Sequence, residues 1–317
     1  MPFLNDEKEY TRNPLMEGFT EGHFETKDGV KLRYLHKGEG MPFIMLHGYG
    51  DDSDCWMLNA PEFAKEYDVY CIDLRGNGWS VAHHGARISR LSADVHEFVE
   101  ALGCEKFNLI GHSMGCSVCW SYIDLFGQDK INKVIFFDEP PMLVSSPHFT
   151  QEEVMKTSSN PMDPYLLPHA VEKYGTGWYT GSPFFDAFSS CFRRCTKEYT
   201  NDEAFLEWAK KLPNDFLEQI AKRPPVNEEV PQKFMADLLL NHLMMDWCDL
   251  FPTIKCPVLF ISGDISHATT IEQGEWFKEM MPQMEWVRFS GEEGGLHEMM
   301  QYGYKKFNKV VSEFLAE

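Results

Sequence analysis

The chain has 317 residues, 43% hydrophobic and 25% charged, so it is long enough and apolar enough to bury a large core. Its formal net charge of −20 disfavours binding to nucleic acid and to anionic membrane surfaces. The nine cysteines show no convincing metal-ligand spacing, and we expect free thiols in a reducing compartment. The amino-terminal segment lacks the charge and apolar pattern of a signal peptide, and no apolar run is long enough to span a membrane. We therefore expect a cytoplasmic protein.

The first 140 residues alternate short apolar runs with helical patterns. Apolar runs and period-two alternation predict strands over 23–26, 30–36, 42–46, 68–72, 107–110 and 133–137. Apolar residues at helical spacing predict helices over 53–65, 92–102 and 116–125. Strands that alternate with helices of this length are typical of βαβ units, so the sequence predicts an α/β fold with a parallel sheet.

This alternation stops after Pro140-Pro141 and resumes near residue 250. In the interval no strand is predicted, and helical periodicity occurs at 203–211, 215–222 and 232–243. The later elements are a strand at 258–262, a helix at 270–281, a strand at 286–289 and an amphipathic helix at 304–315. We predict a core domain of residues 1–140 and 250–317, interrupted by a helical lid of residues 141–249.

One five-residue motif indicates a nucleophile. Gly111-His112-Ser113-Met114-Gly115 follows the predicted strand at 107–110 and precedes the predicted helix at 116–125. In a strand–turn–helix context, G-x-S-x-G forms a nucleophile elbow, in which the serine lies on a sharp turn between small flanking residues. Backbone N–H groups and the amino terminus of the helix then face the oxyanion that develops during acyl transfer. We therefore predict that Ser113 is the catalytic nucleophile.

A second loop, His47-Gly48-Tyr49-Gly50, follows the predicted strand at 42–46. A loop at this place can donate a backbone N–H group to the oxyanion, together with the residue that follows the nucleophile. The predicted oxyanion hole therefore consists of the N–H groups of Tyr49 and Met114. We expect His47 to hold the loop in place rather than to take part in the chemistry.

These loops, with the segment DLRGNGWS at 73–80, resemble the α/β-hydrolase superfamily. The resemblance covers about residues 20–140 and 250–315, and within the superfamily the chain is similar to the esterase, cofactor-free haloperoxidase and lactonase branches. It implies an eight-stranded, mostly parallel sheet with a lid inserted after the sixth strand. It also implies that residues 73–80 form a structural loop near the site.

A serine hydroxyl needs an adjacent base, and in this fold the chain order is serine, acid, histidine. His297 lies after the last predicted strand, in the loop EEGGLHEMM, where the family's catalytic histidine is found. Gly294-Gly295 gives this loop the freedom to turn inward. The competing histidine is His267, at a position where we expect an acid or a substrate contact. We predict that His297 is the base.

The acid has two candidate places. The family usually carries it in a G-x-x-D pattern after the seventh strand, but here that position holds Ser266, and Asp264 comes two residues early. Zearalenone-type lactone hydrolases and pancreatic-type lipases place the acid after the sixth strand, where this chain has Asp138 and Glu139. We favour Asp138, keep Asp264 as the alternative and rank Glu139 third. The acid orients the imidazole and stabilises the imidazolium.

The predicted lid is rich in aromatic and methionine side chains, some of which must form its own core. They are Trp178, Tyr179, Phe184, Phe185, Phe188, Phe192, Trp208, Phe216, Phe234, Met235, Met244, Met245 and Trp247. We expect about a third of them to line a pocket, because ligand pockets are largely apolar. The predicted substrate is a small molecule with a bulky apolar acyl group or a macrocyclic lactone.

The predicted function is a serine hydrolase that cleaves an ester or lactone through an acyl-enzyme. Hydrolysis of C–C bonds or amides and perhydrolysis are alternatives on the same triad, because the pocket decides between them. A non-catalytic ligand-binding protein is a third interpretation. No phosphate-binding glycine motif, basic patch or third ligand near His83-His84 is found, so we expect no cofactor, metal or nucleic-acid partner. The sequence leaves a homodimer open.

Overall fold

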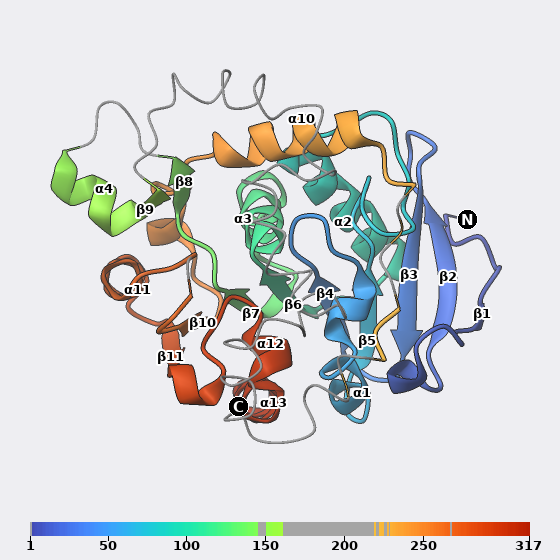
Figure 1. Ribbon diagram of the computed structural model, residues 1–317. Helices are drawn as coiled ribbons and strands as arrows, with labels where there is room; N and C mark the ends of the chain where they lie inside the picture. Colours follow the sequence, from blue (N-terminus) through green and yellow to red (C-terminus); the bar gives the residue numbers. More distant parts are fainter. Residues whose placement is uncertain are drawn as a thin grey trace, which may run out of the picture.

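The computed structural model describes residues 2–144, 150–160, 219, 222–224, 227, 229–266 and 268–317. The strands of its main sheet are β1 (Lys8–Glu9), β2 (Thr20–Glu25), β3 (Lys31–Lys37), β4 (Pro42–Leu46), β5 (Asp68–Ile72), β6 (Phe107–His112), β7 (Ile131–Phe137), β10 (Val258–Gly263) and β11 (Glu285–Phe289). Their spatial order is β1-β2-β3-β5-β4-β6-β7-β10-β11 (Figure 1). The strands from β5 to β11 pair in parallel, which confirms the predicted mostly parallel α/β sheet.

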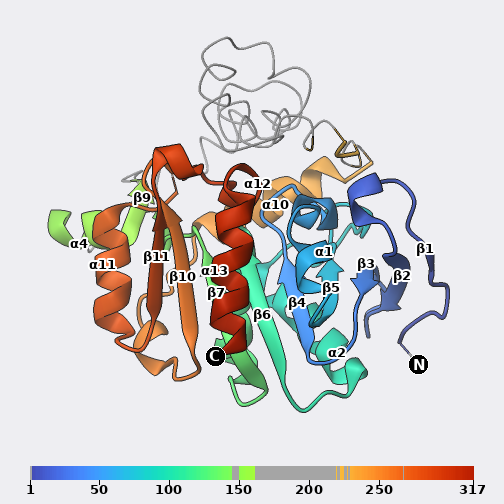
Figure 2. The same cartoon turned by 90° about the horizontal axis from the view of Figure 1, so that it is seen from below.

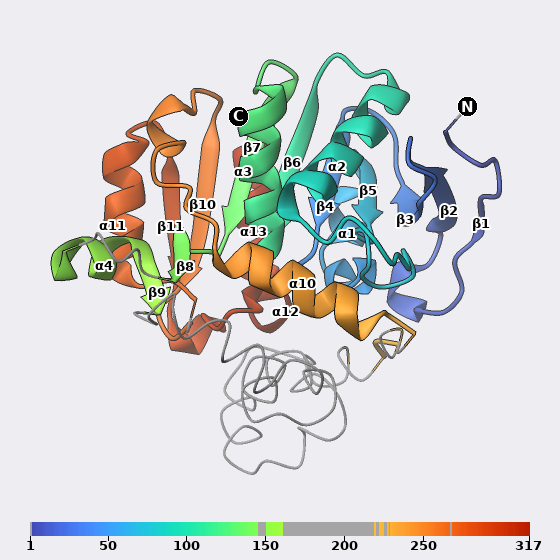
Figure 3. The same cartoon turned by 90° about the horizontal axis from the view of Figure 1, so that it is seen from above.

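Helices cover both faces of this sheet. They are α1 (Ala60–Phe63), α2 (Ile88–Leu102), α3 (Met114–Phe126), α10 (Gln232–Leu243), α11 (Ile271–Met280), α12 (Met299–Tyr302) and α13 (Tyr304–Ala316). Helix α13 lies against one face in front of the central strands (Figure 2), and α2 and α3 lie against the other (Figure 3). The sheet therefore lies between two layers of helices, with a buried apolar cluster on each of its faces.

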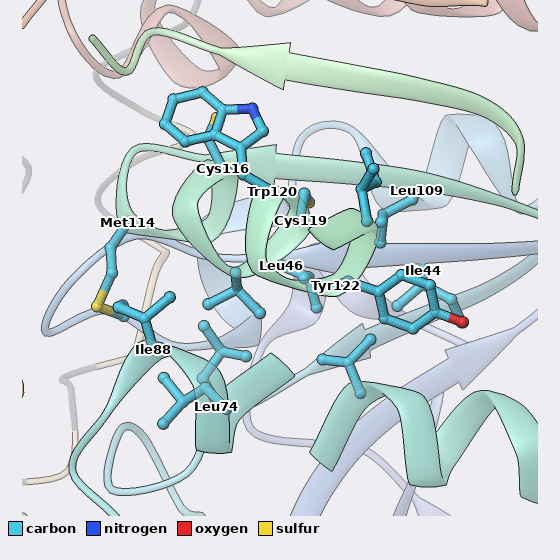
Figure 4. Packing of buried hydrophobic residues seen from close by; sticks show 14 of the residues in the cluster. Ile44, Leu46, Leu74, Ile88, Leu109, Met114, Cys116, Cys119, Trp120 and Tyr122 are labelled. Atoms are coloured by element: carbon cyan, nitrogen blue, oxygen red, sulfur yellow. The ribbon is translucent and has the colours of Figure 1, made fainter. Parts of the chain in front are cut away.

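Strand β4 shows why the strands are apolar on both sides. Ile44 and Leu46 belong to the buried cluster under α2 and α3, whereas Phe43 and Met45 belong to the cluster under α1 and α13. Successive side chains of a strand point to opposite faces, so a central strand covered on both sides needs an uninterrupted apolar run. Figure 4 shows side chains of the first cluster, in which Trp120 and Tyr122 of α3 pack with strand residues.

Three expectations about the elements are corrected. The sheet has nine strands rather than eight, because the two-residue β1 pairs antiparallel with β2 and forms the edge of the sheet. The helix predicted over 53–65 is broken into a 3₁₀ turn at Ser53–Trp56 and the short α1, because Pro61 has no N–H and fits only the first turn of a helix. The insertion holds two short parallel strands, β8 (Met142–Val144) and β9 (Ser158–Asn160), where no strand was expected.

Part of the predicted lid can be compared with the structure. Helix α10 has the same bounds as the predicted helix at 232–243, and a short α4 (Gln151–Thr157) lies beside α11. The predicted helix at 203–211 and most of 215–222 lie outside the described residues. The division into core and lid therefore stays a prediction. Within the described part of the chain, no helix combines the length and apolar character required to cross a bilayer.

Candidate active site

The candidate nucleophile lies on a strained turn between β6 and α3. Ser113 has a φ of 52° and a ψ of −125°, a backbone conformation that a non-glycine residue adopts only where the surroundings enforce it. A Cβ atom on Gly111 would lie 2.4 Å from the backbone carbon of Gly115, and one on Gly115 would lie 2.6 Å from the Leu46 carbonyl oxygen. Both flanking glycines are therefore required by close backbone packing, as the motif predicts.

The loop after β4 lies directly beside this turn. A Cβ atom on Gly48 would lie 3.2 Å from Ser113 Cβ, so the loop backbone approaches the serine closely. His47 holds the loop, because its Nε2 accepts a hydrogen bond from the Leu74 N–H at 2.9 Å and its Nδ1–H donates to the Gly48 carbonyl at 2.7 Å. Burial lowers the pKa of His47 and favours this neutral form.

The two predicted oxyanion donors belong to elements that meet at Ser113. Met114 is the first residue of α3, where backbone N–H groups have no partner within the helix. Tyr49 follows Gly48 in the loop, and its buried hydroxyl donates a hydrogen bond to the Met235 carbonyl of α10 at 2.7 Å. Helix α10 therefore contacts the loop that carries the predicted donor Tyr49.

The structure brings His297 and Asp138 together from positions 159 residues apart. His297 Nδ1 lies 2.7 Å from Asp138 Oδ2, and both side chains are buried. Asp138 directly follows β7 and has a positive φ of 53°. Its carboxylate also accepts hydrogen bonds from the hydroxyls of Ser266, at 2.5 Å, and of Thr269. Three side chains, those of His297, Ser266 and Thr269, thus hold the carboxylate in place.

The other two candidate acids have different partners. Asp264 lies in a partly exposed ion pair with Arg288, with an N–O distance of 2.7 Å. Glu139 is buried and lies 3.2 Å from Nε2 of His242 in α10. Among the described residues, Asp138 is therefore the candidate acid that contacts His297. The competing base, His267, lies outside the described residues.

His297 also contacts the residue next to the nucleophile. Nε2 of His112 lies 3.1 Å from the His297 carbonyl oxygen, and the two imidazole rings have centroids 4.7 Å apart. Ser113 and His297 are each about 5% exposed, so the site is largely shielded from solvent. The loop after β11 therefore reaches the same end of the sheet as the turn after β6.

The charge state of His297 follows from its surroundings. Burial by itself lowers the pKa of the imidazole. The hydrogen bond that its Nδ1–H donates to Asp138, the negative charge of Asp138 and the charges of Glu298 and Glu139 outweigh burial and raise the pKa to about 9. The carboxylates therefore stabilise an imidazolium at this position. This is the property that a base needs after it has taken a proton from a serine.

Sequence reasoning missed the residues that support Asp138. It identified Ser266 only as the residue that occupies the usual position of the acid, whereas the Ser266 hydroxyl donates a hydrogen bond to Asp138. It did not single out Thr269 or His242 at all. Their contacts join segments far apart in the chain, and no local pattern marks them.

A second group of buried charged residues comes from the loop after β4 and from the segment 73–80. Asp73 accepts hydrogen bonds from Arg33, from Ser53 and from the Trp79 N–H, which supports the expected structural role of the 73–80 loop. Asp51 and Asp52 both contact Arg223 of the insertion. Burial raises the pKa of Asp52 to about 7, although Arg223 opposes this.

The described aromatic and methionine residues of the insertion mostly serve packing. Phe234, Met235 and Trp247 are buried in the cluster around α2 and α3, and Met244 is exposed. The other eight aromatic residues predicted for the lid, 178 to 216, lie outside the described residues. Within the described ranges, no group of three metal-ligating side chains gathers at one point.

Known proteins show the same architecture. The chain is 31% identical over 120 residues to a soluble epoxide hydrolase of Corynebacterium sp.. The matched segment covers 38% of this chain and 42% of that protein. The chain spans less than half the length of the first curated relatives that it matches. An esterase of Exiguobacterium antarcticum superposes with a TM-score of 0.71 and 18% identity, over 93% of this chain and 99% of that one.

An enol-lactonase of Burkholderia xenovorans superposes with a TM-score of 0.67 and 21% identity, over 93% of this chain and 100% of that one. At these identities the two solved structures show a shared fold. The sequence profile of the alpha/beta hydrolase fold family matches residues 41–299, which is most of the chain. This match and the sheet that carries Ser113, Asp138 and His297 at one end show that the chain belongs to the α/β-hydrolase family.

Proposed function

We propose that the protein is a serine hydrolase that cleaves a carboxylic ester or lactone. The observation that carries the proposal is the contact of 2.7 Å between His297 Nδ1 and Asp138 Oδ2, beside the strained turn that presents Ser113. A carboxylate on Nδ1 leaves Nε2 as the basic nitrogen of a neutral imidazole. Membership of the α/β-hydrolase family supports hydrolysis as the class of reaction.

In the proposed reaction, His297 takes the proton of the Ser113 hydroxyl as its oxygen attacks the carbonyl carbon. The N–H groups of Tyr49 and Met114 stabilise the oxyanion of the tetrahedral intermediate. The C–O bond to the leaving group then breaks, and His297 protonates the departing oxygen. Water attacks the acyl-enzyme by the same steps and releases the acid and the free serine.

The substrate is proposed to carry a bulky apolar acyl group. This preference rests on the aromatic and methionine content of residues 141–249 and on the apolar character of most ligand pockets. A series of p-nitrophenyl esters of increasing acyl length tests it. We expect kcat/KM to rise with acyl size, and a maximum at the acetyl ester would contradict the preference.

A fluorophosphonate probe tests the chemistry itself, because it reacts covalently with an activated serine. We expect the wild-type protein to be labelled at Ser113 and S113A to remain unlabelled. A control variant, S117A, removes a buried serine of α3 outside the proposed machinery and should still be labelled. Absence of labelling in the folded wild-type protein would favour a ligand-binding function instead.

A further inference from the structure

The residue after Asp138 forms a second buried contact that the proposed reaction does not use. Glu139 Oε1 lies 3.2 Å from Nε2 of His242, and each side chain is 2% exposed. Glu139 comes from the turn after β7, whereas His242 lies in the last turn of α10. The contact therefore joins the turn that carries the proposed acid to a helix of the insertion.

Burial makes this contact hard to account for by stability alone. A carboxylate that leaves water is destabilised unless a donor compensates it, and apolar side chains of similar volume often pack at least as well as a buried pair. The neighbouring residue, Asp138, is in a backbone conformation with positive φ, which persists only where the surroundings hold it. Glu139 contacts α10 from that turn, whereas Ser266 and Thr269 bind Asp138 from the segment after β10.

Glu139 also acts on His297 through its charge. Its carboxylate is one of the groups that raise the pKa of the His297 imidazole, although burial opposes them and Asp138 has the larger effect. In the described part of the chain, Glu139 follows Asp138, acts through its charge on Cys116 of α3 and on His297, and contacts His242 of α10. Glu298 also acts on His297. Among them, His242 is the group whose ring nitrogen lies within ion-pair distance of the Glu139 carboxylate.

We propose that Glu139 and His242 form a positioning pair that holds the Asp138 turn and sets the negative charge acting on His297. This inference rests on the proposed function, because it assigns His297 as the base. Glu139 and His242 do not touch the reacting atoms in this scheme. Their effect reaches the reaction through the proton affinity of His297.

The two partners should have opposite effects on the pH dependence. E139Q keeps the shape of the side chain and an oxygen beside His242, but it removes the negative charge. His297 then loses its proton more readily, and the acid limb of kcat/KM moves to lower pH. H242Q replaces a side chain that can carry a positive charge 3.2 Å from the carboxylate by a neutral one. Glu139 then acts more strongly on His297, and the limb moves to higher pH.

The experiment measures kcat and KM for a p-nitrophenyl ester from pH 5 to 10 in the wild type, E139Q, H242Q and N241A. Asn241 is the matched control, because its side chain accepts a hydrogen bond of 2.8 Å from the Ile88 N–H and ties the same turn of α10 to α2 without a charge. On the acid limb we expect the rate relative to the plateau to rise roughly three- to tenfold in E139Q and to fall by a similar factor in H242Q. N241A should keep the wild-type limb, and KM should change little.

Limbs that stay in place, or that move in the same direction in both variants, would overturn the pair's role while leaving the hydrolase intact. E139D, which restores the charge, should return the limb toward its wild-type position. An NMR titration of the His297 imidazole reads the same shifts without turnover and applies to any variant that folds. The wild type could hydrolyse no ester while the His297 pKa still shifts in opposite directions in E139Q and H242Q. That result would contradict the proposed function but support the positioning role of Glu139 and His242.

Discussion

The two sides of the candidate site are held by different kinds of contact. On the nucleophile side, Ser113 is held by backbone atoms that approach so closely that Gly111 and Gly115 have no room for a side chain. On the acid side, Asp138 is held by side-chain donors from three positions after β10 and β11: Ser266, Thr269 and His297.

This difference separates two ways to damage the site. Added volume should disrupt the nucleophile side, because packed backbone cannot yield. Loss of a charge or a donor should disrupt the acid side, because its geometry depends on hydrogen bonds between side chains. The acid side should also respond to pH, because it contains His297, whose pKa is raised to about 9.

The largest effect is expected for D138N. The amide cannot hold the imidazole as a carboxylate does, so kcat should fall by about 10⁴-fold. Steady-state hydrolysis of a p-nitrophenyl ester measures this loss. The matched control is D264N, which breaks a partly exposed ion pair with Arg288 and should leave kcat within about twofold of the wild type. A large loss in D264N with normal kinetics in D138N would reverse the assignment of the acid.

G115A should test the nucleophile side by volume alone. The new methyl group would meet the Leu46 carbonyl oxygen at 2.6 Å, and we expect the free energy of unfolding to fall by about 3 kcal/mol. Urea denaturation measures the change. G291A is the control, because its added Cβ atom would meet the flexible side chain of Ile265 at 3.4 Å. Equal stability of G115A and the wild type would contradict the close packing of the elbow.

The pH dependence should separate activity from stability on the acid side. The pKa of His297 is raised from 6.5 to about 9, so its contribution to stability is complete below pH 6.5 and is lost as the pH rises through about 9. Activity should rise over the same window, because only the neutral imidazole accepts a proton. Thermal unfolding and kcat/KM, measured from pH 6 to 10, should therefore change in opposite directions. An activity that is flat across this window would contradict the raised pKa.

The smallest effect is expected for Y49F, at the contact between the loop after β4 and α10. Loss of the hydroxyl leaves the Met235 carbonyl without this donor, and we expect the free energy of unfolding to fall by about 1 kcal/mol. Y122F is the matched control, a buried tyrosine of α3 whose hydroxyl has no hydrogen bond to the described residues. A larger loss in Y122F than in Y49F would show that this tether does not contribute.

Sequence patterns predicted the elements whose form depends on residues close together in the chain. Strand β5 and helix α10 have the predicted bounds, because their apolar patterns depend on neighbouring residues. The elbow was predicted for the same reason, since its two glycines and the serine lie within five residues. The prediction of one helix over 53–65 was wrong. The apolar periodicity continues through Pro61, but Pro61 has no N–H group, so the helical hydrogen bonds are interrupted there.

The choice of acid could not be made from sequence patterns. Asp138, Asp264 and Glu139 each follow a strand of the sheet, and a carboxylate at any of these places is compatible with the local sequence. Their different partners, His297, Arg288 and His242, come from three separate segments of the chain. Only the folded chain shows which carboxylate meets which donor.

The sequence by itself determined the α/β class, the turn that presents Ser113 and the loop that supplies His297. The first two depend on sterics and periodicity among residues close together in the chain, whereas His297 was predicted from the resemblance to the α/β-hydrolase family. The tertiary structure decided that Asp138 contacts His297 across 159 positions, that Ser266 and Thr269 support it, and that Glu139 pairs with α10. Those contacts depend on distances that the packing of the whole sheet and its helices sets, and no local pattern encodes such distances.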